Sequence, residues 1–145
     1  MIFTVDSGAS ETVVGIHSLD CVPTVEGHLA KLGVKYEVAN GQVIPNVGEK
    51  RFVGTWFAGE QDQQGITRPV VAQVCGVNKA LLSVGRLDDC GYTTVFAGEK
   101  GSYIQDRVSG EKLQLVKCGT TYTLELWVQD PLAEAAGFGR QGEAR

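Results

Sequence analysis

The sequence lacks a long hydrophobic run and any excess of positive charge. No stretch of about 18 apolar residues occurs, which argues against a transmembrane helix. The first residues have neither the basic opening nor the long apolar segment of a signal peptide, so we expect an intracellular, cytoplasmic protein. The 13 Lys and Arg residues are outnumbered by 17 Asp and Glu residues, and the formal net charge is −4. Direct binding to nucleic acid or to an acidic membrane is therefore not expected.

Closely spaced cysteines and histidines are lacking too. Cys21, Cys75, Cys90 and Cys118 are widely separated, with no C-x-x-C pair, and the two histidines are isolated. This pattern predicts no metal site and no cofactor. An even number of cysteines permits two disulfides, but a chain of 145 residues can fold without them and no export signal is present. Reduced thiols are the favoured interpretation.

Glycine is abundant, with 19 residues spread between short apolar or alternating runs. Turn-forming residues between such runs predict an all-β fold. The Asn40-Gly41 pair between two alternating segments is a strong signal for a β-hairpin. The one helix is expected over Lys79 to Leu87. Strands are expected at 2–5, 12–16, 33–38, 42–47, 51–57, 69–74, 92–96, 102–106, 112–116 and 121–128.

We expect three segments along the chain. Residues 1–97 form the first domain, residues 98–129 a β-meander with glycine-containing turns, and residues 130–145 a flexible tail. The tail is rich in alanine, glycine and charged residues, so it can bury little apolar surface. Because the first residues already have the pattern of a strand, we expect the sequence to be a piece of a longer protein.

The most informative segment is Val5-Asp6-Ser7-Gly8-Ala9-Ser10, at the end of an apolar strand. Such a strand can deliver a carboxylate to the floor of a cleft, and the glycine allows a second loop to approach closely. Two carboxylates pressed together share one proton, and the pair can activate water and protonate a carbonyl oxygen. By itself, Asp-Ser-Gly is more often an ordinary turn. A serine hydrolase is not favoured, because neither serine lies in a G-x-S-x-G motif.

In its wider context the sequence resembles the retropepsin-like aspartic proteases, in particular those in the polyproteins of copia-type retrotransposons. Four segments match in order: Asp6-Ser7-Gly8-Ala9 resembles the catalytic motif, 38–48 the flap hairpin, 81–87 the apolar Gly-Arg segment, and 89–128 the stretch before integrase. The resemblance covers most of the chain from Phe3 to about Val128. It implies an all-β, retropepsin-like half-barrel with a flap hairpin and one short helix, followed by the β-meander.

The resemblance also implies an activity. The chain would be an aspartic endopeptidase, a hydrolase that cuts peptide bonds of a retroelement polyprotein, with water as the nucleophile and no metal. A chain with one Asp-Ser-Gly needs a second copy to complete the site, so a homodimer is expected. The implied roles are catalysis for Asp6, Ser7 and Gly8, substrate binding for Ala9, Ala39, Asn40 and Gly41, and structural support for Gly85 and Arg86.

Two departures from the family pattern leave alternatives open. Ser10 stands where many relatives carry an acid, so Glu11 is the remaining candidate partner for Arg86. Only five residues precede Asp6, where retropepsins have a further strand. The alternative is a catalytically inactive β domain that serves as a dimerisation or peptide-binding module. A third interpretation is a generic β domain in which Asp6 is only a turn residue.

Overall fold

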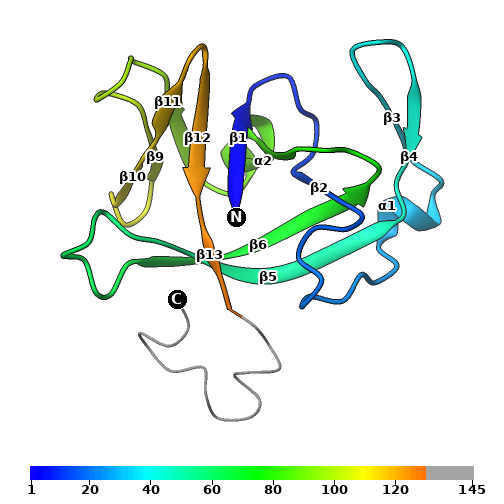
Figure 1. Ribbon diagram of the computed structural model, residues 1–145, viewed down its shortest axis with the longest axis horizontal. Helices are drawn as coiled ribbons and strands as arrows, with labels where there is room; N and C mark the ends of the chain where they lie inside the picture. The colour runs from blue at the N-terminus through cyan, green and yellow to red at the C-terminus, as the bar shows by residue number, and fades with distance from the viewer. Residues whose placement is uncertain (130–145) are drawn as a thin grey trace.

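Strands dominate the computed structural model, which describes residues 1–129 (Figure 1). The expected tail, residues 130–145, lies outside the described residues. The strands are β1 (Ile2–Asp6), β2 (Val13–Gly15), β3 (Lys35–Glu37), β4 (Val43–Pro45), β5 (Gly48–Trp56), β6 (Ile66–Cys75), β7 (Ala80–Ser83), β8 (Tyr92–Val95), β9 (Tyr103–Asp106), β10 (Lys112–Gln114), β11 (Val116–Cys118), β12 (Thr121–Glu125) and β13 (Trp127–Val128). The helices are α1 (His28–Lys31) and α2 (Val84–Asp89).

The main sheet has eight strands in the order β11-β12-β1-β7-β2-β6-β5-β13. The residue 121–128 stretch joins opposite edges of this sheet, because β12 pairs with β1 and β13 pairs with β5. Only Leu126 separates β12 from β13, and its N–H donates to the carbonyl of Met1 at 2.9 Å. The strands β1, β7, β2, β6 and β5 and the 121–128 stretch therefore form a closed ring.

Buried apolar side chains of the ring strands form much of the core. In β1 the side chains alternate, with Phe3 and Val5 buried while Ile2 is exposed and Asp6 is half-buried. Val14, Val74 and Leu82 from the neighbouring strands, and Leu124 from β12, pack in the same cluster. Because Asp6 lies on the face opposite the core, the pleat of β1 places its carboxylate toward solvent.

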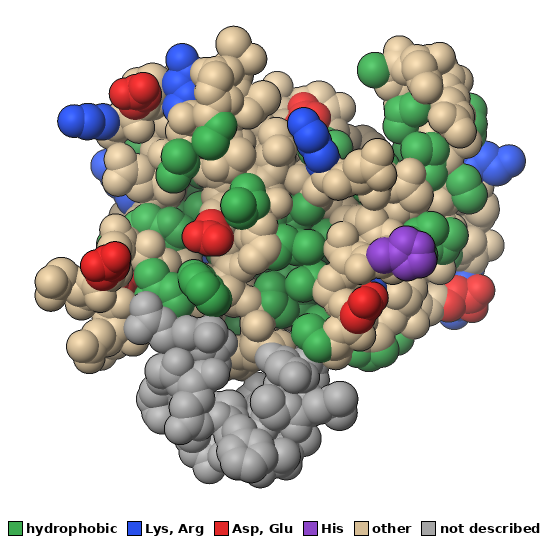
Figure 2. Space-filling view, in the orientation of Figure 1, with side chains coloured by type: hydrophobic (Ala, Val, Ile, Leu, Met, Phe, Trp, Pro, Cys, Tyr) green, Lys and Arg blue, Asp and Glu red, His purple; other side chains and the backbone are tan. Residues whose placement is uncertain are grey.

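Two smaller sheets flank the ring. The strands β3 and β4 pair antiparallel and form a hairpin that stands apart from the body of the molecule (Figures 1 and 2). The strands β8, β9 and β10 form a three-stranded sheet. The division expected at residue 97 falls inside that sheet, because β8 and β9 pair across it, and the later strand β12 lies beside β1.

The structure confirms a mostly β architecture and corrects the expected helix. Residues 79–87 are not one helix, because Ala80–Ser83 is the strand β7 and the helix α2 begins only at Val84. The strand forms because Leu82 packs in the core while β7 pairs with both β1 and β2. A second helix, α1, was not expected from the sequence.

The described residues contain no helix long and apolar enough to cross a membrane. All four cysteines lie within residues 1–129 and are unpaired. Cys75 is buried, whereas the other three thiols are exposed.

Candidate active site

The loop after β1, residues 6–12 and called here the Asp6 loop, surrounds the candidate carboxylate. It leads from β1 to β2, which are consecutive in the chain but separated in the sheet by β7. The loop therefore crosses the end of β7, where Asp6 lies opposite Ser83 in the parallel register. The Gly8 N–H donates to Asp6 Oδ1 at 2.7 Å, so the carboxylate already receives one backbone hydrogen bond. Its position is at the end of an interior strand rather than at a free edge of the sheet.

Ser83 in β7 forms hydrogen bonds with two residues of the Asp6 loop. It is fully buried, at 0% exposure, and its Oγ donates to the carbonyl of Ala9 at 2.7 Å. Its own N–H donates to Thr12 Oγ1 at 3.0 Å. The same Oγ accepts the N–H of Arg86 at 3.1 Å, so Ser83 is also the N-cap of α2. One small hydroxyl thus joins the loop, the strand β7 and the helix α2.

An ion pair between Glu11 and Arg86 links the Asp6 loop to the helix α2. Arg86 Nη2 donates to Glu11 Oε1 at 2.7 Å, and Arg86 Nε donates to the second carboxylate oxygen. Glu11 is 9% exposed, whereas the Arg86 side chain is half-exposed. Hydrogen bonds to Glu11 raise the pKa of the Arg86 guanidinium above its ordinary value, so it stays charged. The ion pair that the sequence suggested between Glu11 and Arg86 is present, and the bidentate geometry fixes both groups.

The remaining predicted residues of the loop are accessible. Ser7 and Gly8 are exposed and Ala9 is half-buried. A Cβ at Gly8 would lie 3.3 Å from Asp6 Oδ1, so a side chain there would crowd the carboxylate. At Gly85 a Cβ would lie 3.7 Å from Ser83 Oγ, which is an ordinary contact. Close packing within the chain therefore does not require glycine at position 85.

The other predicted binding residues form the tip of the β3–β4 hairpin. Ala39, Asn40 and Gly41 are all exposed. Gly41 has φ of 83°, and its N–H donates to the carbonyl of Val38 at 2.9 Å, as in a three-residue hairpin turn that ends in a left-handed glycine. Among the described residues, no hydrogen bond or ion pair joins this tip to the Asp6 loop. Within one chain the two groups of predicted residues are therefore separate.

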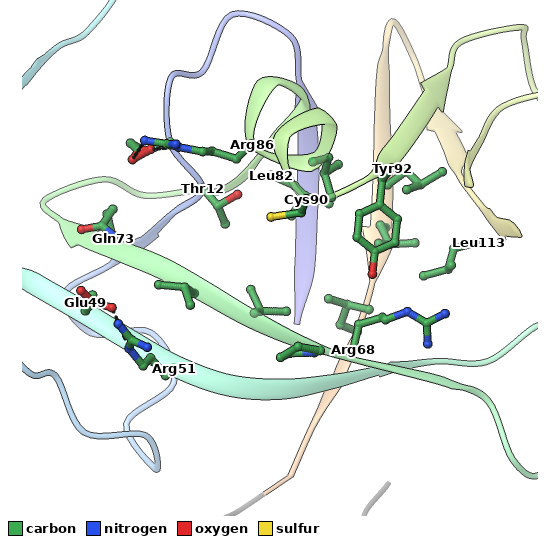
Figure 3. A pocket seen from close by; sticks show the side chains of 18 of the residues that line it. Thr12, Glu49, Arg51, Arg68, Gln73, Leu82, Arg86, Cys90, Tyr92 and Leu113 are labelled. Carbon is green, nitrogen blue, oxygen red and sulfur yellow. Dashed lines mark hydrogen bonds and ion pairs between the residues drawn. The ribbon is translucent and has the colours of Figure 1, made fainter. Parts of the chain in front are cut away.

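A cavity of about 540 Å³ lies behind the Asp6 loop, between α2 and the ribbon of β5 and β6 (Figure 3). Most of its lining is apolar, and Leu82, Leu87 and Val70 contribute to it. Apolar side chains are visible on the floor of a hollow near the centre of the face in Figure 2. Asp6 does not line the cavity, whereas Glu11 and Arg86 do. The cavity is therefore lined in part by the ion pair of Glu11 and Arg86, and it does not include the surface that carries the Asp6 carboxylate.

The sequence reasoning missed two supports, Ser83 and Thr12. Ser83 stands between Leu82 and Val84 in an apolar run, and a polar residue there has to find buried partners. That pattern was the available signal, but the partners themselves depend on the strand order. Among the described residues, no group of three His, Cys, Asp or Glu side chains is placed to hold a metal ion.

Comparisons with known proteins do not place the chain in a family. No protein-family model matches it, and neither the curated proteins nor the solved structures contain a significant match.

Proposed function

We propose that the chain is an aspartic endopeptidase of the retropepsin type that becomes active as a homodimer. The observation that carries the proposal is the Asp6 loop. It places a half-exposed carboxylate at the end of an interior strand, above a buried serine and beside a bidentate ion pair. An ordinary surface turn needs none of these supports. The mostly β architecture and the projecting hairpin support the proposal.

In this mechanism, Asp6 of one chain meets Asp6 of a second chain across a two-fold axis. Two adjacent carboxylates cannot both be ionised, so the pair holds one proton between them. The ionised member removes a proton from a water molecule as this water attacks the scissile carbonyl carbon. The protonated member donates its proton to the carbonyl oxygen. No covalent intermediate between enzyme and substrate is formed.

The β3–β4 hairpin supplies a second element of the proposed site in each chain. Its tip, Ala39 to Gly41, is exposed and stands apart from the body, as expected of a flap that closes over an extended peptide. A substrate strand between the flap and the Asp6 loop would add to the sheet through backbone hydrogen bonds. The preferred substrate is therefore an extended, unfolded segment of polypeptide, such as a linker in a polyprotein.

Cleavage of a mixed peptide library at about pH 5 tests the proposal, because a shared-proton pair requires one protonated carboxyl group. We expect cleavage by the wild type and none by Asp6→Asn or in the presence of pepstatin. Asp20→Asn is the matched control, because Asp20 is an exposed carboxylate outside the Asp6 loop. Cleavage that survives Asp6→Asn would refute the assigned role of Asp6. A folded dimer without any cleavage would instead favour the non-catalytic dimerisation or peptide-binding module.

A further inference from the structure

A buried amide lies at the base of the β3–β4 hairpin. Asn46 is 7% exposed and lies between β4 and β5. Its Oδ1 accepts the N–H of Gly48 at 2.8 Å. Its Nδ2 donates one hydrogen bond to the Tyr36 hydroxyl at 2.9 Å and another to Gln73 Oε1 at 2.8 Å. The Asn46 side chain therefore uses both amide hydrogens and its oxygen, and it joins β3 to β6.

The hairpin has few other attachments. None of the side chains from Lys35 to Pro45 is buried, so apolar packing holds the hairpin only weakly. The backbone closes its base through the Asn46 N–H, which donates to the carbonyl of Val34 at 3.0 Å. Among the described residues, the bond between Tyr36 and Asn46 is the one side-chain hydrogen bond that links residues 35–45 to the rest of the chain. The orientation of the hairpin therefore depends strongly on this bond.

Gln73, the second partner of the Asn46 amide, is hydrogen-bonded to the Asp6 loop. Gln73 is 8% exposed, and its backbone N–H donates to the carbonyl of Thr12 at 2.8 Å. Thr12 is the last residue of the loop, and its Oγ1 accepts the N–H of Ser83, which lies opposite Asp6 in β7. A continuous series of hydrogen bonds thus runs from the hairpin strand β3 to the strand that flanks the candidate carboxylate.

The backbone that follows Asn46 is also restrained. Gly48 has φ of 149°, and a Cβ there would lie 2.6 Å from the carbonyl oxygen of Val25. The Val47 N–H donates to the carbonyl of Val74 at 2.9 Å. The backbone on the β5 side of Asn46 therefore cannot move easily. Movement of the hairpin relative to the body has to occur on the β4 side, where the Tyr36 bond is the restraint.

We propose that Asn46 is a positioning residue that sets the orientation of the flap relative to the Asp6 loop through Tyr36 and Gln73. Asparagine suits this position because the Tyr36 hydroxyl and Gln73 Oε1 both accept, and only a side-chain amide offers two donors and one acceptor here. An ionised aspartate has no donor, so it could accept from the Tyr36 hydroxyl but could not satisfy Gln73 Oε1. The consequence for catalysis rests on the proposed function, whereas the restraint on the hairpin does not.

Amide hydrogen exchange of the full chain, followed by mass spectrometry, tests the restraint directly. We expect exchange of residues 35–45 to become roughly fivefold faster in Tyr36→Phe, because one hydrogen bond to a buried amide is lost. Asn46→Ala should accelerate it further. Tyr103→Phe is the matched control, since Tyr103 lies in the separate three-stranded sheet. Exchange in β12 should stay unchanged. Equal acceleration in residues 35–45 and in β12 would mean a global loss of stability and would overturn the proposal. Unchanged exchange in residues 35–45 would overturn it as well.

Peptide cleavage by the same variants tests the consequence for the reaction. We expect Tyr36→Phe to raise KM about threefold or more with kcat changed less than twofold, because the flap contacts substrate in both ground and transition states. A fall in kcat at unchanged KM would contradict a positioning role in substrate binding. Should the wild type show no cleavage at all, the proposed function would fail, while faster exchange in the hairpin would still support the restraint by Asn46.

Discussion

At the scale of single residues, the pair of Glu11 and Arg86 is asymmetric. The Glu11 carboxylate, which belongs to the Asp6 loop, is buried, whereas the Arg86 guanidinium is half-exposed to solvent. Removing the acid leaves a cation that water can solvate. Removing the cation leaves a buried carboxylate without its partner, which is the more expensive loss. Substitutions of Glu11 and of Arg86 should therefore lower the free energy of unfolding by different amounts, although both break the same contact.

We expect Arg86→Gln to lower the free energy of unfolding by about 2 kcal/mol and Glu11→Gln by about 1 kcal/mol. Both estimates allow for solvent screening around the exposed arginine. Urea denaturation at neutral pH measures both values, and Lys117→Gln, at an exposed lysine in β11, serves as the control. Equal costs for the two substitutions would show that the burial of Glu11 is not what makes this contact important.

Cys75 differs from the other three cysteines by its burial. Burial raises the pKa of its thiol, so at a given pH a smaller fraction is the reactive thiolate than at an exposed cysteine. Alkylation of the folded chain at pH 8, with site-resolved mass spectrometry, should modify Cys21, Cys90 and Cys118 at least about tenfold faster than Cys75. In urea the four rates should become similar. Fast labelling of Cys75 in the folded chain would contradict its place in the core.

At the scale of elements, α2 depends on a cap that serves two structures at once. Ser83 Oγ accepts the N–H of Arg86 in the first turn of the helix and donates to the carbonyl of Ala9 in the Asp6 loop. Ser83→Ala therefore removes an N-cap and leaves the carbonyl of Ala9 without this donor. We expect it to lower the free energy of unfolding by about 2 kcal/mol. The exposed Ser109 gives the control, because Ser109→Ala should change that free energy by less than about 0.5 kcal/mol. Equal values in urea denaturation would rule out Ser83 as a shared support.

The elements that the sequence could predict are those with local signals. The strand expected at residues 2–5 and the turn at Asn40-Gly41 both appear where expected, because strand and turn preferences are set by neighbouring residues. The expected helix over 79–87 was wrong in its first half. Alanine and leucine favour a helix locally, but pairing with β1 and burial of Leu82 outweigh that preference.

The candidate site divides in the same way. The Asp6 loop is a local motif and was found from the sequence. Ser83, Thr12 and Gln73 act on the loop only because β7 lies between β1 and β2 and because β6 lies beside β2. These are long-range pairings that no spacing along the chain reveals. The supports of a site are therefore harder to predict than the group they support.

At the scale of the whole molecule, the ring is complete but the proposed site is not. The 121–128 stretch closes the ring by pairing with both β1 and β5, so the fold needs no second chain to bury its core. The described residues nonetheless provide one Asp-Ser-Gly and one copy of the β3–β4 hairpin, which is half of the proposed two-carboxylate site. Folding and activity should therefore respond differently to dilution and to mixing.

Subunit mixing makes this difference measurable. When wild type is mixed with an equal amount of Asp6→Asn and allowed to exchange, random pairing leaves about half of the wild-type subunits in wild-type dimers. Cleavage activity at constant wild-type concentration should fall to about one half, and further with excess variant, because a mixed dimer has one ionisable carboxyl group and cannot share a proton between two. Addition of Asp20→Asn should leave the activity per active subunit unchanged. Activity that does not respond to the Asp6→Asn chain would mean that each chain works alone, and the shared site would then have to be abandoned.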